Sequence, residues 1–120
     1  MFKILLVLLF SFISLFGFEN LTVDNFESKI KGKNVIVDIY ADWCPPCRVV
    51  AKNLEDFDII KPDNIEIYKV DFDKHSEIAH RYGVKSLPTL LFFKDGKLID
   101  AYVGVISPEK LLNKSKLDFN

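Results

Sequence analysis

Apolar and polar positions along the chain first divide it into strands. The run from Val35 to Ala41 is almost continuously apolar and rich in β-branched residues, which is typical of a central strand buried on both faces. Asp95-Gly96 lies between two further apolar runs and is a strong hairpin signal. Four strands are predicted from these patterns: Val35–Ala41, Ile65–Asp71, Thr89–Lys94 and Lys97–Val103.

The longest predicted helix follows Pro45 and Pro46, because from there apolar residues recur every three or four positions. Prolines are tolerated in a first helical turn, where the backbone N–H groups have no intrahelical partner. The apolar stripe of this helix comprises Cys47, Val50, Leu54 and Phe57, with Ala51 and Ile60 broadening it.

Three shorter helices are predicted from capping signals. Asp24 and Glu27 have the spacing of a capping box, with Phe26 and Ile30 on one face of the helix that follows. A second helix is predicted from His75 to Tyr82, with Ile78, Ala79 and Tyr82 facing inward and Gly83 as a left-handed cap. Ser107 is predicted to cap a last helix that begins at Pro108 and packs through Leu111 and Leu112.

From residue 35 onward the order is therefore β-α-β-α-β-β-α, which predicts an α/β domain. Its mixed central sheet would be flanked by helices on both faces. In such sheets the functional site lies beyond the carboxyl end of a central strand, where a loop leads into a helix. Cys44 occupies that position.

Length and charge narrow the function classes. The 120 residues suffice for one domain, predicted over residues 19–120. Sixteen basic residues against seventeen acidic ones give a net charge of −1, without a run of Lys or Arg. We therefore expect neither a nucleic-acid partner nor an electrostatic attraction to anionic membranes.

The first 17 residues resemble a signal peptide or an N-terminal membrane anchor. Lys3 precedes an apolar run from Ile4 to Phe16 that is short for a hydrocarbon core of ~30 Å, which takes about 20 helical residues. Cleavage after Gly17 would give a periplasmic or secreted protein, and an uncleaved segment would tether the chain through residues 2–18. A cytoplasmic core helix is the remaining alternative.

The chain has two cysteines, Cys44 and Cys47, too close in sequence to stabilise a fold by restricting the unfolded chain. A helix N-terminus lowers the pKa of a thiol, so Cys44 is the predicted nucleophile. Since Pro45 and Pro46 have no N–H, we expect the Cys47 amide to donate a hydrogen bond to the Cys44 sulfur. Cys47 lies on the apolar stripe, so Cys44 is expected to be exposed and Cys47 buried, as attack followed by resolution requires.

A zinc site is the competing interpretation of this pair. Cys44 and Cys47, together with His75 and His80, formally supply four ligands. The separation between the two pairs is too long for a compact finger, and five positions on a helix align two histidines poorly for one metal. We therefore predict no metal, with both histidines on the solvent face of their helix.

Several segments together resemble the thioredoxin family. Tyr40-Ala41-Asp42-Trp43-Cys44-Pro45-Pro46-Cys47 is similar to the active-site segment of thioredoxins and their extracytoplasmic relatives. Ser86-Leu87-Pro88-Thr89 resembles the cis-proline loop of the family, and Asp38 matches its buried acid. The resemblance extends from about Leu21 to Leu112, and it implies a thioredoxin fold and a redox disulfide between Cys44 and Cys47.

The resemblance also implies roles for further residues. Asp38 would accept the proton of the buried thiol, with Lys69 on the neighbouring strand as its partner; the alternative is a structural ion pair. Pro88 would be cis, whereas an ordinary turn would be trans, and the backbone of Leu87 would bind an extended substrate.

The resemblance implies a place in the substrate site for two more residues, each with an alternative role. Trp43 would shield the disulfide, or it would belong to the core. Gly104 would leave room for the substrate chain or simply end a strand. Pro45-Pro46 departs from the Gly-Pro of common thioredoxins and removes one backbone donor, so we expect a redox poise different from theirs.

The predicted function is therefore a thiol–disulfide oxidoreductase that reduces disulfides in extracytoplasmic proteins. The alternatives are an oxidase or isomerase of the same fold and, more remotely, a binding module without catalysis. No nicotinamide-binding motif is present and no cofactor is expected. Electrons would come from a membrane electron-donor protein, the partners would be protein disulfides or dithiols, and the domain is expected to be a monomer.

Overall fold

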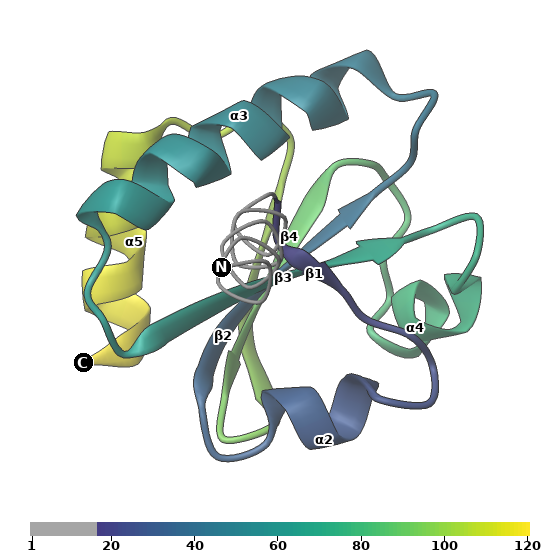
Figure 1. The fold of residues 1–120 in the computed structure, drawn as a ribbon, viewed down its shortest axis with the longest axis horizontal. Coiled ribbons are helices and arrows are strands. Elements are labelled where there is room, and N and C mark those ends of the chain that lie inside the picture. Colours follow the sequence, from purple (N-terminus) through teal and green to yellow (C-terminus); the bar gives the residue numbers. More distant parts are fainter. Residues whose placement is uncertain (1–16) are drawn as a thin grey trace, which may run out of the picture.

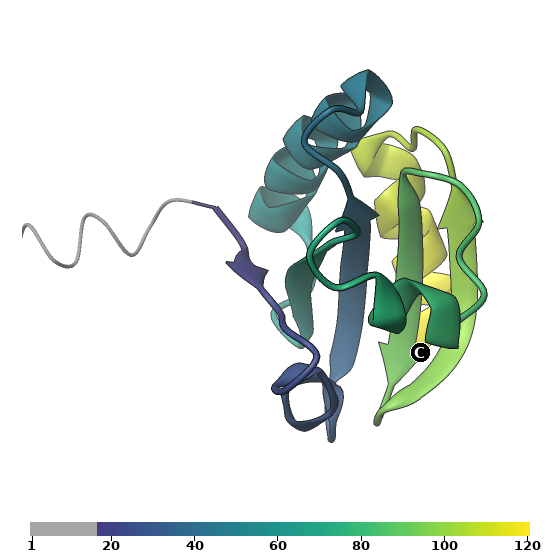
Figure 2. The same cartoon turned by 90° about the vertical axis from the view of Figure 1, so that its right-hand side faces the viewer.

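The computed structural model describes residues 17–120 and contains one five-stranded sheet. The predicted leader, apart from Gly17, lies outside the described residues. The strand order is β1-β3-β2-β4-β5, with β1 and β5 at opposite edges (Figure 2). The strands are β1 (Glu19–Asn20), β2 (Asn34–Tyr40), β3 (Ile65–Asp71), β4 (Thr89–Lys94) and β5 (Lys97–Val103).

The sheet is mixed, as predicted. Strands β1, β3 and β2 pair in parallel, whereas β4 pairs antiparallel with both β2 and β5. The predicted hairpin turn is confirmed, because Asp95 and Gly96 have φ angles of 50° and 78°. Strand β1 was not predicted, since its two residues are too few to show any periodicity.

Helices cover both faces of the sheet (Figure 1). Helices α2 (Phe26–Ile30) and α4 (Ser76–Arg81) pack on one face, and α3 (Pro45–Ile60) and α5 (Pro108–Phe119) on the other. Because side chains alternate along a strand, β2 contributes Val35, Val37 and Ile39 to the α2–α4 core. Ile36 belongs to the α3–α5 core. Asp38 is two positions further along β2, so its side chain lies on the same face of the strand as that of Ile36. The acid of β2 therefore points to the side of the sheet that carries α3.

Several details of the predicted helices are wrong. The first helix is not opened by an Asp24–Glu27 capping box: it begins at Phe26, after a loop in which Thr22 and Asn25 exchange hydrogen bonds. Ala51 and Ile60 are exposed, since the 3.6-residue period places both outside the arc of α3 that faces the sheet.

The other capping predictions are confirmed. The Ser107 side chain accepts a hydrogen bond from the Lys110 amide at 3.2 Å and caps α5. Gly83 follows α4 with a φ of 73°, and Tyr82 packs half-buried against the rings of Phe26 and Phe93. In the part of the chain that the structure describes, no helix combines the length and apolarity needed to span a membrane.

Candidate active site

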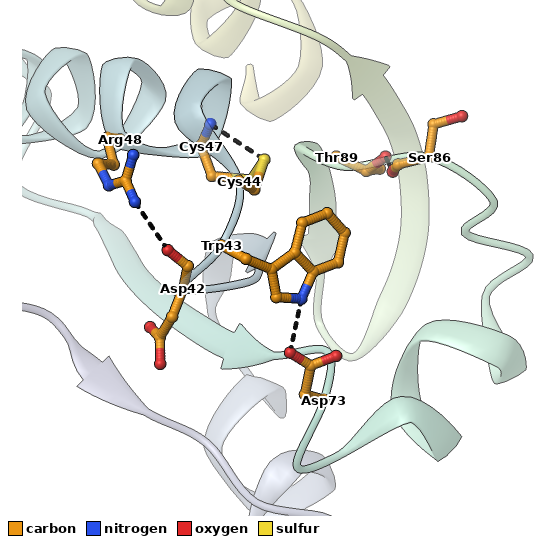
Figure 3. Close-up of a disulfide and its surroundings, with 8 residues drawn as sticks. All are labelled: Asp42, Trp43, Cys44, Cys47, Arg48, Asp73, Ser86 and Thr89. Atoms are coloured by element: carbon orange, nitrogen blue, oxygen red, sulfur yellow. Dashed lines mark hydrogen bonds between the residues drawn. A yellow bond between two sulfur atoms is a disulfide. The ribbon is translucent and has the colours of Figure 1, made fainter.

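The two cysteines lie where β2 leads into α3, and they form a disulfide (Figure 3). Cys44 is the N-cap of α3, with Pro45 and Pro46 in its first turn. The Cys47 amide donates a hydrogen bond to Cys44 Sγ at 3.3 Å, which confirms the bond predicted from the two prolines. The sulfur thus lies at the N-terminus of a 16-residue helix, where the helix dipole favours negative charge.

The predicted contrast in exposure between the two cysteines is wrong. Cys44 is 4% exposed and Cys47 is 3% exposed. The two residues form a small apolar cluster with Ala41, against which Tyr40 and Leu87 pack. Cys44 is removed from solvent because its sulfur is bonded to that of Cys47 and because Leu87 packs against both residues. The position of Cys44 at the start of the helix does not indicate either contact.

The loop before β4 brings a second segment to the disulfide. The Leu87–Pro88 bond is cis, as the resemblance implied. Thr89 Oγ1 donates a hydrogen bond to the Ser86 carbonyl at 2.6 Å and closes this loop (Figure 3). The Gly104 amide donates to the Pro88 carbonyl at 2.9 Å, so the chain just after β5 lies beside the cis-proline. Gly104 has a φ of 101°, a conformation that favours glycine.

Trp43 is a surface residue, so its predicted alternative as a core aromatic is wrong. Its side chain is 65% exposed, and the indole N–H donates to Asp73 Oδ2 at 2.9 Å (Figure 3). With Phe72 and Leu87, Trp43 lines a cavity of about 320 Å³ next to the cis-proline loop. No pattern in the sequence indicates Asp73, because its contact with Trp43 depends on how the loop after β3 returns to the active-site segment.

Behind the disulfide lies a second cavity, of about 200 Å³, which Asp38, Cys47 and Lys69 line together. Asp38 is 3% exposed, and its Oδ1 has no hydrogen-bond partner among residues 17–120. Burial raises the pKa of Asp38 to about 7, and the charge of Lys69 acts in the opposite direction. The carboxyl therefore changes protonation near neutral pH, within a cavity that it shares with the buried cysteine.

Lys69 lies directly across from Asp38 in the register of β2 and β3. None of the ion pairs found among the described residues includes Lys69, so a contact ion pair with Asp38, the structural alternative, is not formed. Instead, Lys69 Nζ lies 5.5 Å from the centre of the Tyr40 ring. The sequence showed neither this contact nor the place of Tyr40 in the cavity wall.

The histidines are not assembled with the cysteines. His80 is exposed, with its ring 6.0 Å from that of Phe72, and His75 is half-buried just before α4. Within the range 17–120, no three His, Cys, Asp or Glu side chains are grouped so as to hold a metal ion. The chemistry available to Cys44 and Cys47 is disulfide exchange: a thiolate at a helix N-terminus, a second thiol three residues on, and a buried acid beside that thiol.

Comparison with known proteins leads to the same chemistry. The family model "Thioredoxin" matches residues 17–116. The chain is 39% identical over 90 residues to "Thioredoxin" of Bacillus subtilis, which covers 75% of this chain and 86% of that protein. It is 39% identical over 79 residues to "Thioredoxin 1" of Synechococcus elongatus, which covers 66% of this chain and 74% of that protein. It is 35% identical over 95 residues to "Thioredoxin Y1, chloroplastic" of Arabidopsis thaliana, which covers 78% of this chain and 55% of that protein. With the family model spanning most of the chain, and with a disulfide at the start of α3, the chain belongs to the thioredoxin family and is a thiol–disulfide oxidoreductase.

Proposed function

We propose that the protein reduces disulfides in extracytoplasmic proteins through a dithiol–disulfide cycle of Cys44 and Cys47. The observation that carries the proposal is the convergence of three features at one end of the sheet. These are the disulfide at the α3 N-terminus, the cis-proline loop against it and the cavity with Asp38 behind it. Each feature supports one step of the reaction.

The cycle begins with both cysteines reduced. The Cys44 thiolate attacks one sulfur of a substrate disulfide, and the other substrate sulfur leaves as a thiolate and takes up a proton. Cys47 then loses its proton and attacks Cys44 Sγ, which breaks the mixed disulfide and releases the second substrate thiol. Two electrons have then passed from the dithiol to the substrate disulfide, and the Cys44–Cys47 bond seen in the structure is the product.

Asp38 is the proposed acceptor of the Cys47 proton, directly or through water, because both residues line one cavity. An acid with a pKa of about 7 is ionised in a useful fraction of molecules near neutral pH. Lys69 would favour the ionised form of Asp38 across the strand pair.

The substrate chain is proposed to lie over Trp43, Leu87, Pro88 and Gly104. Leu87 packs on the cysteines, Trp43 directly precedes Cys44 and is exposed, and the Gly104 amide donates to the Pro88 carbonyl. These contacts support a substrate path along the four positions. The backbone of Leu87 would pair with an extended peptide at this point.

Replacing Gly104 by alanine should lower the kcat/KM for a protein substrate such as insulin more than that for a small aromatic disulfide. The side chain would narrow the surface on which the peptide lies, and at a φ of 101° it also adds about 1–3 kcal/mol of backbone strain. Gly32→Ala is the matched control, because Gly32 has a φ of 71° in the turn before β2, and its Cβ, like that of Gly104, would meet open space. An equal selectivity change in both variants would rule out the proposed role of Gly104.

Residues 1–17 are proposed to direct the domain of residues 19–120 out of the cytoplasm, as a removed signal or as an anchor. The short apolar run after Lys3 supports this proposal.

Since no nicotinamide-binding motif is present in the sequence, we propose a membrane electron-donor protein that reduces the Cys44–Cys47 bond after each cycle. The domain is proposed to act as a monomer.

The direction of electron flow is tested by the reduction potential of the Cys44–Cys47 pair. Purified protein is equilibrated with glutathione or dithiothreitol buffers, and the fractions of dithiol and disulfide are counted by thiol alkylation and mass. A value near −270 mV, roughly that of thioredoxin, is expected for a reductase. A value near −120 mV, roughly that of a strong oxidant, would make the protein a disulfide-forming enzyme and overturn the proposed direction.

A further inference from the structure

The Lys69 ammonium is held by groups other than the acid that it faces. Its Nζ lies over the Tyr40 ring, 5.5 Å from the ring centre, at cation–π distance. The Tyr40 hydroxyl in turn donates a hydrogen bond to Asn20 Oδ1 at 2.9 Å. The ring is therefore fixed at its outer end while its face supports the ammonium.

Asn20 reaches this position because of β1. In the sheet Asn20 is the register partner of Lys69, and the next residue, Leu21, donates its amide to the Lys69 carbonyl at 2.8 Å. Gly17 also borders the ammonium, since a Cβ built on it would lie 3.9 Å from Lys69 Nζ. A two-residue strand with both residues exposed contributes little to the core, yet it lies beside the lysine that faces Asp38.

We propose that Tyr40 and Asn20 are positioning residues that hold the Lys69 ammonium beside the Asp38 cavity, and that β1 is thereby part of the proton-transfer machinery. The proposal rests on the proposed role of Asp38 as proton acceptor. Tyr40, Asp38 and Lys69 line the same cavity, so the three side chains come together from β2 and β3. Without the Tyr40 ring, the Lys69 side chain would be free to extend into water, and its ammonium would move away from Asp38.

Other charged groups reach the cavity as well. Asp42 and Arg48 line it, and the Arg48 guanidinium donates to the Asp42 carbonyl at 3.1 Å. Across β2 from Asp38, β4 presents Leu90, which carries no charge. Lys69 is the group whose charge lowers the pKa of Asp38, against the burial that raises it. Displacing its ammonium should therefore raise the pKa of Asp38 further.

The test follows the Asp38 carboxyl by ¹³C NMR in the oxidised protein, where no thiol titrates. Tyr40→Leu removes the ring and should raise the titration midpoint of Asp38 by about half a pH unit or more. Tyr40→Phe and Asn20→Ala keep the ring but break its hydrogen bond, and each should shift the midpoint in the same direction by less. The pH profile of insulin reduction should move with the midpoint in each variant.

Matched variants separate positioning from a general change in structure. Tyr102→Phe removes a hydroxyl from a similar pair at the opposite edge of the sheet, where Lys110 Nζ lies 5.0 Å from the ring centre, and should leave Asp38 unchanged. Lys69→Gln should raise the midpoint as Tyr40→Leu does, and the double variant should show no further rise, because both changes remove the same ammonium.

The two proposals fail in different ways. A midpoint that moves in Lys69→Gln and stays fixed in Tyr40→Leu, Tyr40→Phe and Asn20→Ala would overturn the positioning role and leave Asp38 as acceptor. A midpoint that stays fixed in Lys69→Gln would also overturn the positioning role, since the Lys69 ammonium would then have no effect on the titration of Asp38. If the titration midpoint of Asp38 shifts in these variants while the pH profile of insulin reduction stays unchanged, the acceptor role on which the inference rests would be overturned.

Discussion

Replacing Cys44 by serine should lower insulin reduction by at least about 10³-fold, as expected when the covalent nucleophile of an enzyme is removed. A serine hydroxyl at the α3 N-terminus is not ionised at neutral pH and forms no mixed disulfide. The measurement is the rate of insulin reduction with dithiothreitol as electron source. Full activity in the Cys44→Ser protein would contradict both the reductase and the oxidase interpretation.

Cys47→Ser is the matched variant, because it makes the same change three residues away and stops the cycle at a different step. Cys44 still attacks, the mixed disulfide cannot be resolved, and covalent complexes should accumulate. In cells carrying the full-length chain, non-reducing gels and mass spectrometry should find trapped partners with secretory leaders. Cytoplasmic partners would contradict the proposed compartment, and a lack of partners would favour a non-catalytic binding module.

Replacing Asp38 by asparagine should stabilise the oxidised protein by about 2–4 kcal/mol at pH 8 and change its stability little at pH 4. Burial raises the pKa of Asp38 from 3.8 in the unfolded chain to about 7 in the folded protein, so folding favours the protonated acid. The cost of burying the carboxylate is absent below about pH 4, grows as the pH rises to 7 and is constant above it. Urea unfolding of the oxidised protein at several pH values measures this difference.

A control and a second readout complete this prediction. Asp63→Asn changes an exposed carboxyl, and its effect should stay within about 0.5 kcal/mol at every pH. The more stable Asp38→Asn protein should reduce insulin more slowly at pH 7, by about 10-fold or more, because the proton acceptor of Cys47 is missing. An equal gain in stability at pH 4 and pH 8 would show that the folded protein does not hold Asp38 at a raised pKa.

The sequence predicted strands β2 to β5 and the helices well, apart from the start of α2, and it missed β1. Strands β2 to β4 and helix α3 carry apolar patterns over six to sixteen residues, and such patterns follow directly from burial. Strand β5 has no buried residue, and the Asp95-Gly96 hairpin signal predicted it. Helix α2 has five residues, and its start depends on the exchange of hydrogen bonds between Thr22 and Asn25 rather than on the expected capping box. Strand β1 exists because β3 offers it a free edge, which no local pattern records.

For the site, the sequence by itself determined the chemistry. Two cysteines around two prolines at the start of an apolar stripe specify the helix N-terminus and the Cys47 amide bond, since these depend only on neighbouring residues. Tertiary structure alone decided the exposure of Cys44 and Trp43 and the contacts of Lys69 with Tyr40 and of Tyr40 with Asn20. These depend on strand register and on loops that meet across the sheet, and residues far apart in the chain carry no local sign of the neighbours that folding gives them.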